Sequence, residues 1–217
     1  MNTDHLFVKL KFSEEQLQAI KDLYYKYFDP KMPLVEEYRG TGNIAMWREG
    51  LSYDFGRTKS EGLEKMVNGF DVHECNGDPL WDVFGDLLPH MGKSATITKM
   101  PPCTQMIPHI DRVWRPIPIY FPIEGCNENA VSTCYSTPKE NLVTTGDGHP
   151  AFIADQSKVS IDATFSIKDN AYLTNTLVLH GVENKQDIQR IAFGWNFRSP
   201  DLTYDQCLEI LRSINMI

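Results

Sequence analysis

The sequence lacks the features that mark several large classes of protein. No segment approaches the roughly 20 apolar residues that a membrane-spanning helix needs, and the stretch from Met1 to Lys9 has no signal-peptide pattern. Positive charge is scarce, since 21 Lys and Arg are outnumbered by 29 Asp and Glu and the net charge is −8. This balance disfavours a surface that binds phosphates. We therefore expect no membrane, no nucleic-acid partner and a cytoplasmic location.

Cysteine is sparse and shows no paired spacing. The five cysteines, an odd number, lie at positions 75, 103, 126, 134 and 207, and no C-x-x-C pair occurs. The spacing excludes a zinc knuckle and a thioredoxin-type motif. We expect mostly buried free thiols in a reducing compartment.

What is present is the composition of an ordinary globular protein. The chain has 217 residues, of which 41% are hydrophobic and 23% charged, and is most simply one domain. Capping boxes at Ser13–Gln16 and Thr203–Gln206 predict helices that begin there. Further short helices are expected near Ser60 to Asn68 and from Asp78 to Leu88, the second with a proline directly after its cap position.

From Ser94 onward, short runs rich in β-formers alternate with clusters of Gly, Pro, Asn and Asp. The expected strands are 95–98, 117–123, 130–135, 151–154, 159–165, 171–173, 177–180 and 188–197. Repeated short strands with such turns predict an antiparallel sandwich or barrel. The single domain (1–217) then divides into a helical amino-terminal region (1–93), a β core (94–198) and a carboxy-terminal helix (199–217).

The segment His109-Ile110-Asp111, with the distant His180, has the pattern of a metal site. An H-x-D pair places an imidazole and a carboxylate on the same face of a strand or at its end. A histidine from another strand can complete three ligands on one side of a metal, which leaves positions for a co-substrate and O2 and suits non-haem Fe(II). Alone, H-x-D also fits a surface turn. His180 adds weight because it ends an apolar run.

Arg190 comes ten positions after His180 and opens the apolar run from Ile191 to Phe197. A hairpin between the two would bring the guanidinium beside the metal. There it could bind a carboxylate in a two-pronged fork.

Four segments carry a resemblance to a known family: Met100–Asp111, Ile117–Ile123, Ala171–Thr176 and His180–Arg190. On them, the region from Ser94 to Phe197 resembles the core of the iron- and 2-oxoglutarate-dependent oxygenases. The nearest branch holds prolyl hydroxylases, aspartyl/asparaginyl β-hydroxylases and phage-encoded relatives. The resemblance implies a mainly β fold with flanking helices and a double-stranded β-helix (jelly-roll or cupin-like) core. It places the Fe(II) ligands on His109, Asp111 and His180, and the 2-oxoglutarate anchor on Arg190.

The resemblance also implies a reaction. Relatives use O2 to convert 2-oxoglutarate to succinate and CO2 and to hydroxylate a C–H bond, here expected on an amino-acid residue of a peptide or protein, or on a free amino acid. Asp111 favours hydroxylation, because related halogenases lack the carboxylate ligand. Two positions depart from the family pattern. The glycine common before the first ligand strand is Cys103, and the small hydroxyl residue often found two positions after the arginine is Ala192.

Other side chains are candidates for a role in binding, but each also has a purely structural explanation. Arg112, Trp114 and Arg115 follow the H-x-D pair and are candidate substrate contacts, against a solvated turn with the tryptophan packed beneath it. Tyr120 lies where relatives often place a residue that contacts oxoglutarate, although an outward-facing strand tyrosine is favoured. Asn175 is expected to hold a turn. Core positions are expected for Trp195 and Phe197, and no ligand role for His5, His73, His90 and His149.

Three classes of function stay open on the sequence. The first is a 2-oxoglutarate-dependent hydroxylase. The second is another β-barrel metalloenzyme, such as a cupin-type dioxygenase or isomerase, which uses the same triad without oxoglutarate. The third is a non-catalytic β-sandwich module in which the H-x-D pair is accidental. Arg190 separates the first from the second, since only the first needs a buried counter-charge there. The sequence does not indicate an oligomeric state.

Overall fold

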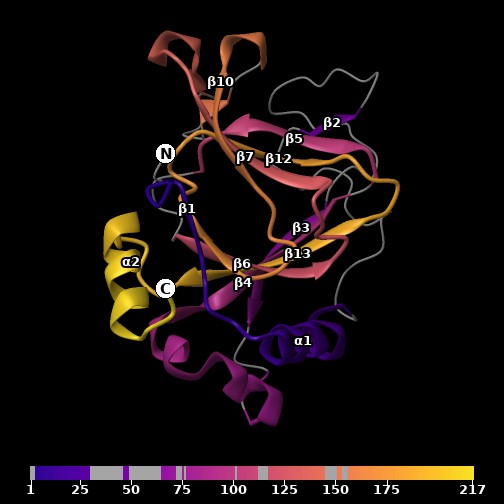
Figure 1. Cartoon of the computed structure of the whole chain (residues 1–217), viewed down its shortest axis with the longest axis vertical. Helices are drawn as coiled ribbons and strands as arrows, with labels where there is room; N and C mark the ends of the chain where they lie inside the picture. The colour runs from indigo at the N-terminus through magenta and orange to yellow at the C-terminus, as the bar shows by residue number, and fades with distance from the viewer. Residues whose placement is uncertain are drawn as a thin grey trace.

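The computed structural model describes residues 3–29, 46–48, 65–71, 75, 77–100, 102–111, 117–144, 151–152 and 156–217. Within these residues two antiparallel sheets face each other, with β5, β7 and β12 opposite β4, β6 and β13 (Figure 1). This arrangement confirms the mainly β fold with a double-stranded β-helix core.

Each sheet joins strands that are far apart in the sequence. The first has the order β1 (Phe7–Lys9), β11 (Tyr172–Thr174), β6 (Pro118–Glu124), β13 (Arg190–Phe197), β4 (Met91–Met100), β3 (Lys65–Asp71). The second has the order β10 (Ser160–Phe165), β7 (Ala130–Ser136), β12 (His180–Asn184), β5 (Thr104–His109), β9 (Ala151–Phe152), β8 (Val143–Thr144), and β2 (Met46–Arg48) also pairs with β5. The central strands of the two sheets carry the residues discussed below.

The two long helices begin where the capping boxes predict. In α1 (Glu14–Leu23) the Gln16 amide donates to Ser13 Oγ at 3.2 Å and the Ser13 amide donates to Gln16 Oε1 at 2.8 Å. The same reciprocal pair, Thr203 with Gln206, begins α2 (Tyr204–Ser213). The other helical segments within the described residues are a π-helical turn η1 (Tyr24–Phe28) and 3₁₀ segments η5 (Pro79–His90), η6 (Lys139–Asn141) and η7 (Gln156–Lys158). No helix in these described ranges combines the length and apolarity needed to cross a membrane.

The main hydrophobic core lies between the first sheet and the helical layer. Along β13, alternate side chains Ile191, Phe193, Trp195 and Phe197 join this core. Phe193 stacks on Phe28 with ring centroids 5.4 Å apart, and Trp195 lies 5.2 Å from the ring of Trp81. The predictions that Trp195 and Phe197 are core residues are therefore confirmed. The alternate positions of β13, beginning with Arg190, face the other sheet.

The expectation of a helical amino-terminal region is only partly right. The region contributes β1, β2 and β3 as well as helices. Residues 65–68, expected to be helical, belong to β3, whose Lys65 pairs with Lys99 of β4, and residues 60–64 lie outside the described part. The local sequence has good helix formers, but pairing satisfies the backbone groups of β4 on that side, and this tertiary requirement overrides local propensity. The expected strand at 177–180 is also shifted, since a turn occupies 176–178 and β12 begins at His180.

Asp78 ties η1 to η5. Its carboxylate accepts a hydrogen bond from the Leu80 amide at 2.9 Å at the start of η5, and from Tyr27 Oη at 2.7 Å, and forms an ion pair with Lys26 Nζ at 2.5 Å. The Lys26 contact, with those of Tyr27 and Leu80, lowers the pKa of Asp78 from 3.8 to about 2. The folded state therefore favours the ionised carboxylate.

This pKa shift predicts how stability depends on pH. Because the pKa of Asp78 is lower in the folded state, its ionised carboxylate stabilises the folded protein fully above about pH 4. This stabilisation is lost as pH falls towards about 2. Chemical unfolding across this range should show a free energy of unfolding that falls less steeply in Asp78→Asn than in wild type. Asp82→Asn, the same change at an exposed position of η5, is the control. Equal slopes in wild type and Asp78→Asn would contradict the prediction.

Candidate metal centre

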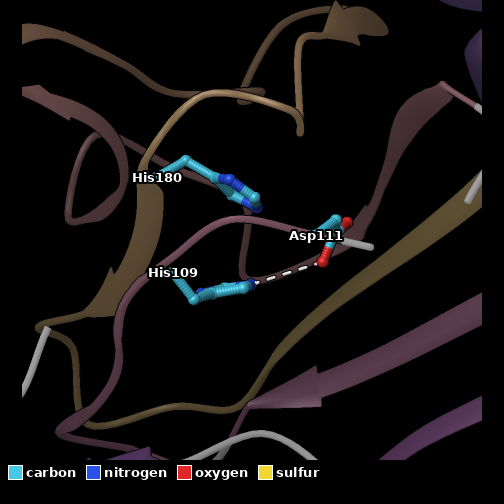
Figure 2. A group of neighbouring side chains, drawn as sticks. All are labelled: His109, Asp111 and His180. Atoms are coloured by element: carbon cyan, nitrogen blue, oxygen red, sulfur yellow. Dashed lines mark ion pairs between the residues drawn. The ribbon is translucent and has the colours of Figure 1, made fainter. Parts of the chain in front are cut away.

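The two histidines of the expected triad lie side by side on neighbouring strands. His109 ends β5, His180 begins β12, and the two are register partners. Their ring centroids are 4.4 Å apart with the planes tilted by 47°. Figure 2 shows both rings pointing into the same space, where Asp111 also points.

Asp111 lies just beyond β5 and reaches the same space. Its backbone amide donates to Thr176 O at 2.9 Å, which fixes the chain after the strand. One carboxylate oxygen, Oδ1, lies 3.6 Å from His109 Nε2. His109, Asp111 and His180 are only 2%, 7% and 8% exposed. The expected geometry of H-x-D at a strand end is therefore present.

The donor atoms of the three residues suit one metal ion. One nitrogen or oxygen from each residue can be chosen so that all three lie within 4.8 Å of one another. Two atoms bound to the same ion at about 2.1 Å can be at most about 4.2 Å apart, so at most a small side-chain rotation is needed. Two imidazoles and a carboxylate on one side are the facial arrangement of non-haem Fe(II) sites.

The surroundings of His180 select the tautomer that a metal requires. Its Nδ1 lies 2.9 Å from Val178 O, and a carbonyl oxygen can only accept, so Nδ1 carries the proton. Nε2 then keeps its lone pair for a metal. Such a bond also fixes the orientation of the ring.

Cys134 is the register partner of His180 on β7 but is not part of the metal-binding group. Burial, with a smaller effect from Asp162, raises the pKa of its thiol to about 11. The thiol is therefore protonated at neutral pH. All five cysteines are free, and three of them are buried, as expected.

Arg190 faces the same pocket, but from the opposite sheet. The expected hairpin with the His180 strand is wrong, because β12 pairs with β5 and β7 whereas β13 pairs with β4 and β6. The chain crosses between the sheets after β12, so Arg190 lies across the pocket and not beside His180 on one sheet. The short segment between His180 and Arg190 could form a hairpin within one sheet or connect the two sheets, so the spacing alone could not distinguish these two connections.

The guanidinium of Arg190 is buried and has no carboxylate partner among the described residues. The residue is 3% exposed, and its Nη1 contacts the Met100 sulfur at 3.7 Å. Among the described residues it forms no ion pair, and its Nε has no hydrogen-bond acceptor. Burying such a charge is costly unless an anion pairs with it.

One pocket connects the triad with Arg190. Its empty volume, including the solvent space at its opening, is about 560 Å³. The lining residues are Thr98, Met106, His109, Asp111, Tyr120, Ser132, Thr133, Phe165, Ile167, Thr174, His180, Gly181, Val182 and Arg190. Apart from the triad and Arg190, these described residues are uncharged.

Tyr120 is not the outward-facing strand tyrosine that the sequence favoured. It lines the pocket, and its register partner on β13 is Gly194. A Cβ at Gly194 would lie 2.8 Å from Tyr120 Cε1, so only glycine leaves room for the ring. The signal for this packing was a glycine inside an apolar strand, which often marks a close approach.

The remaining expectations divide between confirmed and untested. Asn175 holds a turn, since its Oδ1 accepts from the Leu177 amide at 3.2 Å and its Nδ2 donates to His5 O at 3.0 Å. Arg112, Trp114 and Arg115, the candidate substrate contacts, lie outside the described residues, as do His73 and His149. His5 and His90 are not part of the metal-binding group.

Cys103, which stands where the oxygenases that the sequence resembles commonly have glycine, adopts φ +52° directly before β5. This left-handed conformation is the one that glycine adopts without strain. The backbone geometry expected before the first ligand strand is therefore kept although the glycine is not.

No protein-family model matches the chain, and no curated protein matches it significantly. Among solved structures, it is similar to SnoK, a non-haem α-ketoglutarate-dependent carbocyclase from nogalamycin biosynthesis, with a TM-score of 0.53 and 12% identity over 95% of this chain and 87% of that one. The non-haem α-ketoglutarate-dependent epimerase SnoN of the same biosynthesis has a TM-score of 0.49 and 8% identity, over 91% of this chain and 83% of that one. AviO1 from Streptomyces viridochromogenes Tue57 has a TM-score of 0.46 and 9% identity, over 91% of each chain. The likeness to SnoK shows a shared fold.

The donor set predicts one metal site. Mn(II) or Ni(II), as stable substitutes for Fe(II), should bind with a stoichiometry of one by calorimetry. His109→Ala and His180→Ala should each abolish this binding, because each removes one of three ligands. His5→Ala, an exposed histidine outside the group, should bind as wild type does. Circular dichroism checks the fold, and unchanged affinity in both ligand variants would refute the site.

Proposed function

We propose that this protein is an Fe(II)- and 2-oxoglutarate-dependent oxygenase that hydroxylates a C–H bond. The observation that carries the proposal is the buried guanidinium of Arg190 in the same pocket as the triad, without a carboxylate partner among the described residues. A dicarboxylate that reaches from a metal to Arg190 would supply the missing anion. 2-Oxoglutarate has a 2-oxo acid at one end, which can chelate a metal, and a free carboxylate at the other.

The chain's own residues have distinct roles in this proposal. His109, Asp111 and His180 would hold Fe(II) on one side and leave the other positions open. Iron with 2-oxoglutarate and O2 supplies the oxidising chemistry, with release of succinate and CO2. The Val178 carbonyl keeps the proton of His180 on Nδ1, so Nε2 stays available as a ligand. Arg190 would bind the far carboxylate and so orient the co-substrate.

The pocket wall supports this division of roles. Met106 and Ile167 are apolar and buried, and Phe165 and Val182 are half-buried beside them. An apolar wall keeps water away and strengthens the pairing of a guanidinium with a carboxylate. It would also protect the oxidising centre from side reactions.

The alternatives from the sequence are less well supported. A cupin-type enzyme that uses the triad without oxoglutarate would leave the charge of Arg190 without a function or a counter-ion in the described pocket. A non-catalytic module would have no reason to bury two histidines and an aspartate together beside a pocket.

The proposed substrate is an amino-acid residue in a peptide or protein, or a free amino acid. This rests on the resemblance of the sequence to amino-acid hydroxylases and on Asp111, which occupies the coordination position that halogenases leave for a halide. Arg112, Trp114 and Arg115 stay candidates for substrate contact, as a carboxylate clamp and an aromatic wall.

Arg190→Ala should weaken 2-oxoglutarate binding and spare the metal. A buried carboxylate that loses its charged partner costs roughly 3–5 kcal/mol, so the dissociation constant should rise by at least about tenfold. Calorimetry on Mn(II)-loaded protein measures both affinities. The matched control is Arg198→Ala, an exposed arginine just after β13. Equal oxoglutarate binding in wild type and Arg190→Ala would refute the co-substrate and favour the cupin-type alternative.

The product should be a hydroxylated amino-acid residue. With Fe(II), 2-oxoglutarate and a panel of peptides and free amino acids, one member should gain a single oxygen atom from labelled O2 while one succinate forms. His180→Ala should abolish both products. Label absent from the product, or chlorination or desaturation in its place, would refute hydroxylation while leaving the metal site intact.

A further inference from the structure

The position two residues after Arg190 on β13 has no hydroxyl, although the oxygenases that the sequence resembles often have one there. Next to Arg190 on the inner face of β13 is Ala192, which is buried and has no polar side-chain atom. A carboxylate has about four acceptor positions, and an arginine fork occupies two of them. A carboxylate buried there needs a further donor, because an acceptor left unsatisfied in an apolar site is destabilising.

The neighbouring strand provides a hydroxyl at that position. Thr98 of β4 is the register partner of Ala192, and Met100, two positions along β4, is the partner of Arg190. Side chains of register partners on one face lie close together, with Cβ atoms about 4.5–5.5 Å apart. The Arg190 guanidinium leans towards β4, since its Nη1 contacts the Met100 sulfur.

Thr98 is placed to act on a ligand. It is 5% exposed and lines the same pocket as Arg190 and the triad. As a β-branched residue it would be at home in any strand, so its presence alone says little. Its position beside both Ala192 and Arg190, with its side chain on the pocket wall, distinguishes it from the other threonines of the sheet.

We propose that the Thr98 hydroxyl donates a hydrogen bond to the same carboxylate that Arg190 binds, in place of the hydroxyl that position 192 lacks. The inference rests on the proposed function and names a second anchor of its co-substrate. Thr98 is a binding residue in this proposal and takes no part in metal coordination.

Calorimetry with 2-oxoglutarate on Mn(II)-loaded protein tests the proposal. Thr98→Val keeps the shape and removes the hydroxyl, so the dissociation constant should rise about tenfold, while Thr98→Ser should bind nearly as wild type does. Adding Ala192→Ser to Thr98→Val should restore most of the affinity, because it returns a hydroxyl to the register-paired position. Thr164→Val makes the same chemical change at an exposed position of β10 that does not line the pocket, and it should have no effect.

A second ligand shows where the hydroxyl acts. 2-Oxobutyrate keeps the 2-oxo acid but has no far carboxylate, so wild type and Thr98→Val should bind it equally. Equal 2-oxoglutarate binding in wild type and Thr98→Val, or an equal loss for both ligands, would overturn the role of Thr98 while the proposed function stands. If wild type itself does not bind 2-oxoglutarate, both proposals fail. Thermal melts of the variants and the Thr98→Ser protein separate a folding defect from a lost contact.

Discussion

The fold depends on the alternation of side chains along β13. One face of this strand carries Phe193 and Trp195 into the apolar layer beneath α1 and η5, and the other carries Arg190 towards the second sheet. Burying each large side chain contributes about 1.5–3 kcal/mol, so the register of the strand is strongly specified. A slip by one residue would move the guanidinium into the core and the aromatic rings into the pocket. The position of Arg190 is thus set by the same packing interactions that stabilise the domain.

The two sheets divide the proposed ligand between them. The second sheet and the residues just beyond β5 provide the triad, and the first sheet provides Arg190. A metal ion and a guanidinium are both positively charged and would lie at separate places in one pocket. Together they favour a ligand with two carboxylates over a ligand with one. A ligand that bridges the sheets and binds only the folded state would also stabilise it, by about 2.7 kcal/mol at a concentration of 100 times its dissociation constant. Co-substrate binding and stability of the domain are therefore expected to be coupled.

The sequence predicted those parts of the structure that depend on local pattern. The strands β6, β7, β10 and β13 follow β-rich runs bounded by turn residues, and both capping boxes begin helices. His109 and Asp111 could be selected because a short spacing at a strand end brings two donors together. Features that depend on distant pairing were not predictable. β3 was expected as a helix because its partner β4 is not visible in the local sequence. The sheet that holds Arg190 and the inward direction of Tyr120 follow from strand order, which spacing does not encode.

The two departures from the pattern of the resembled family have a common physical origin. A backbone conformation can be adopted by more than one residue type, and a hydrogen-bond donor can be supplied from more than one strand. Cys103 adopts the left-handed backbone that glycine usually provides. Thr98 is the register partner of Ala192, and the Cβ atoms of register partners lie about 4.5–5.5 Å apart. A hydroxyl on β4 can therefore reach the same carboxylate as a hydroxyl at position 192, although Thr98 and Arg190 are far apart in the sequence. A sequence motif does not reveal such a group, whereas its position in the folded pocket does.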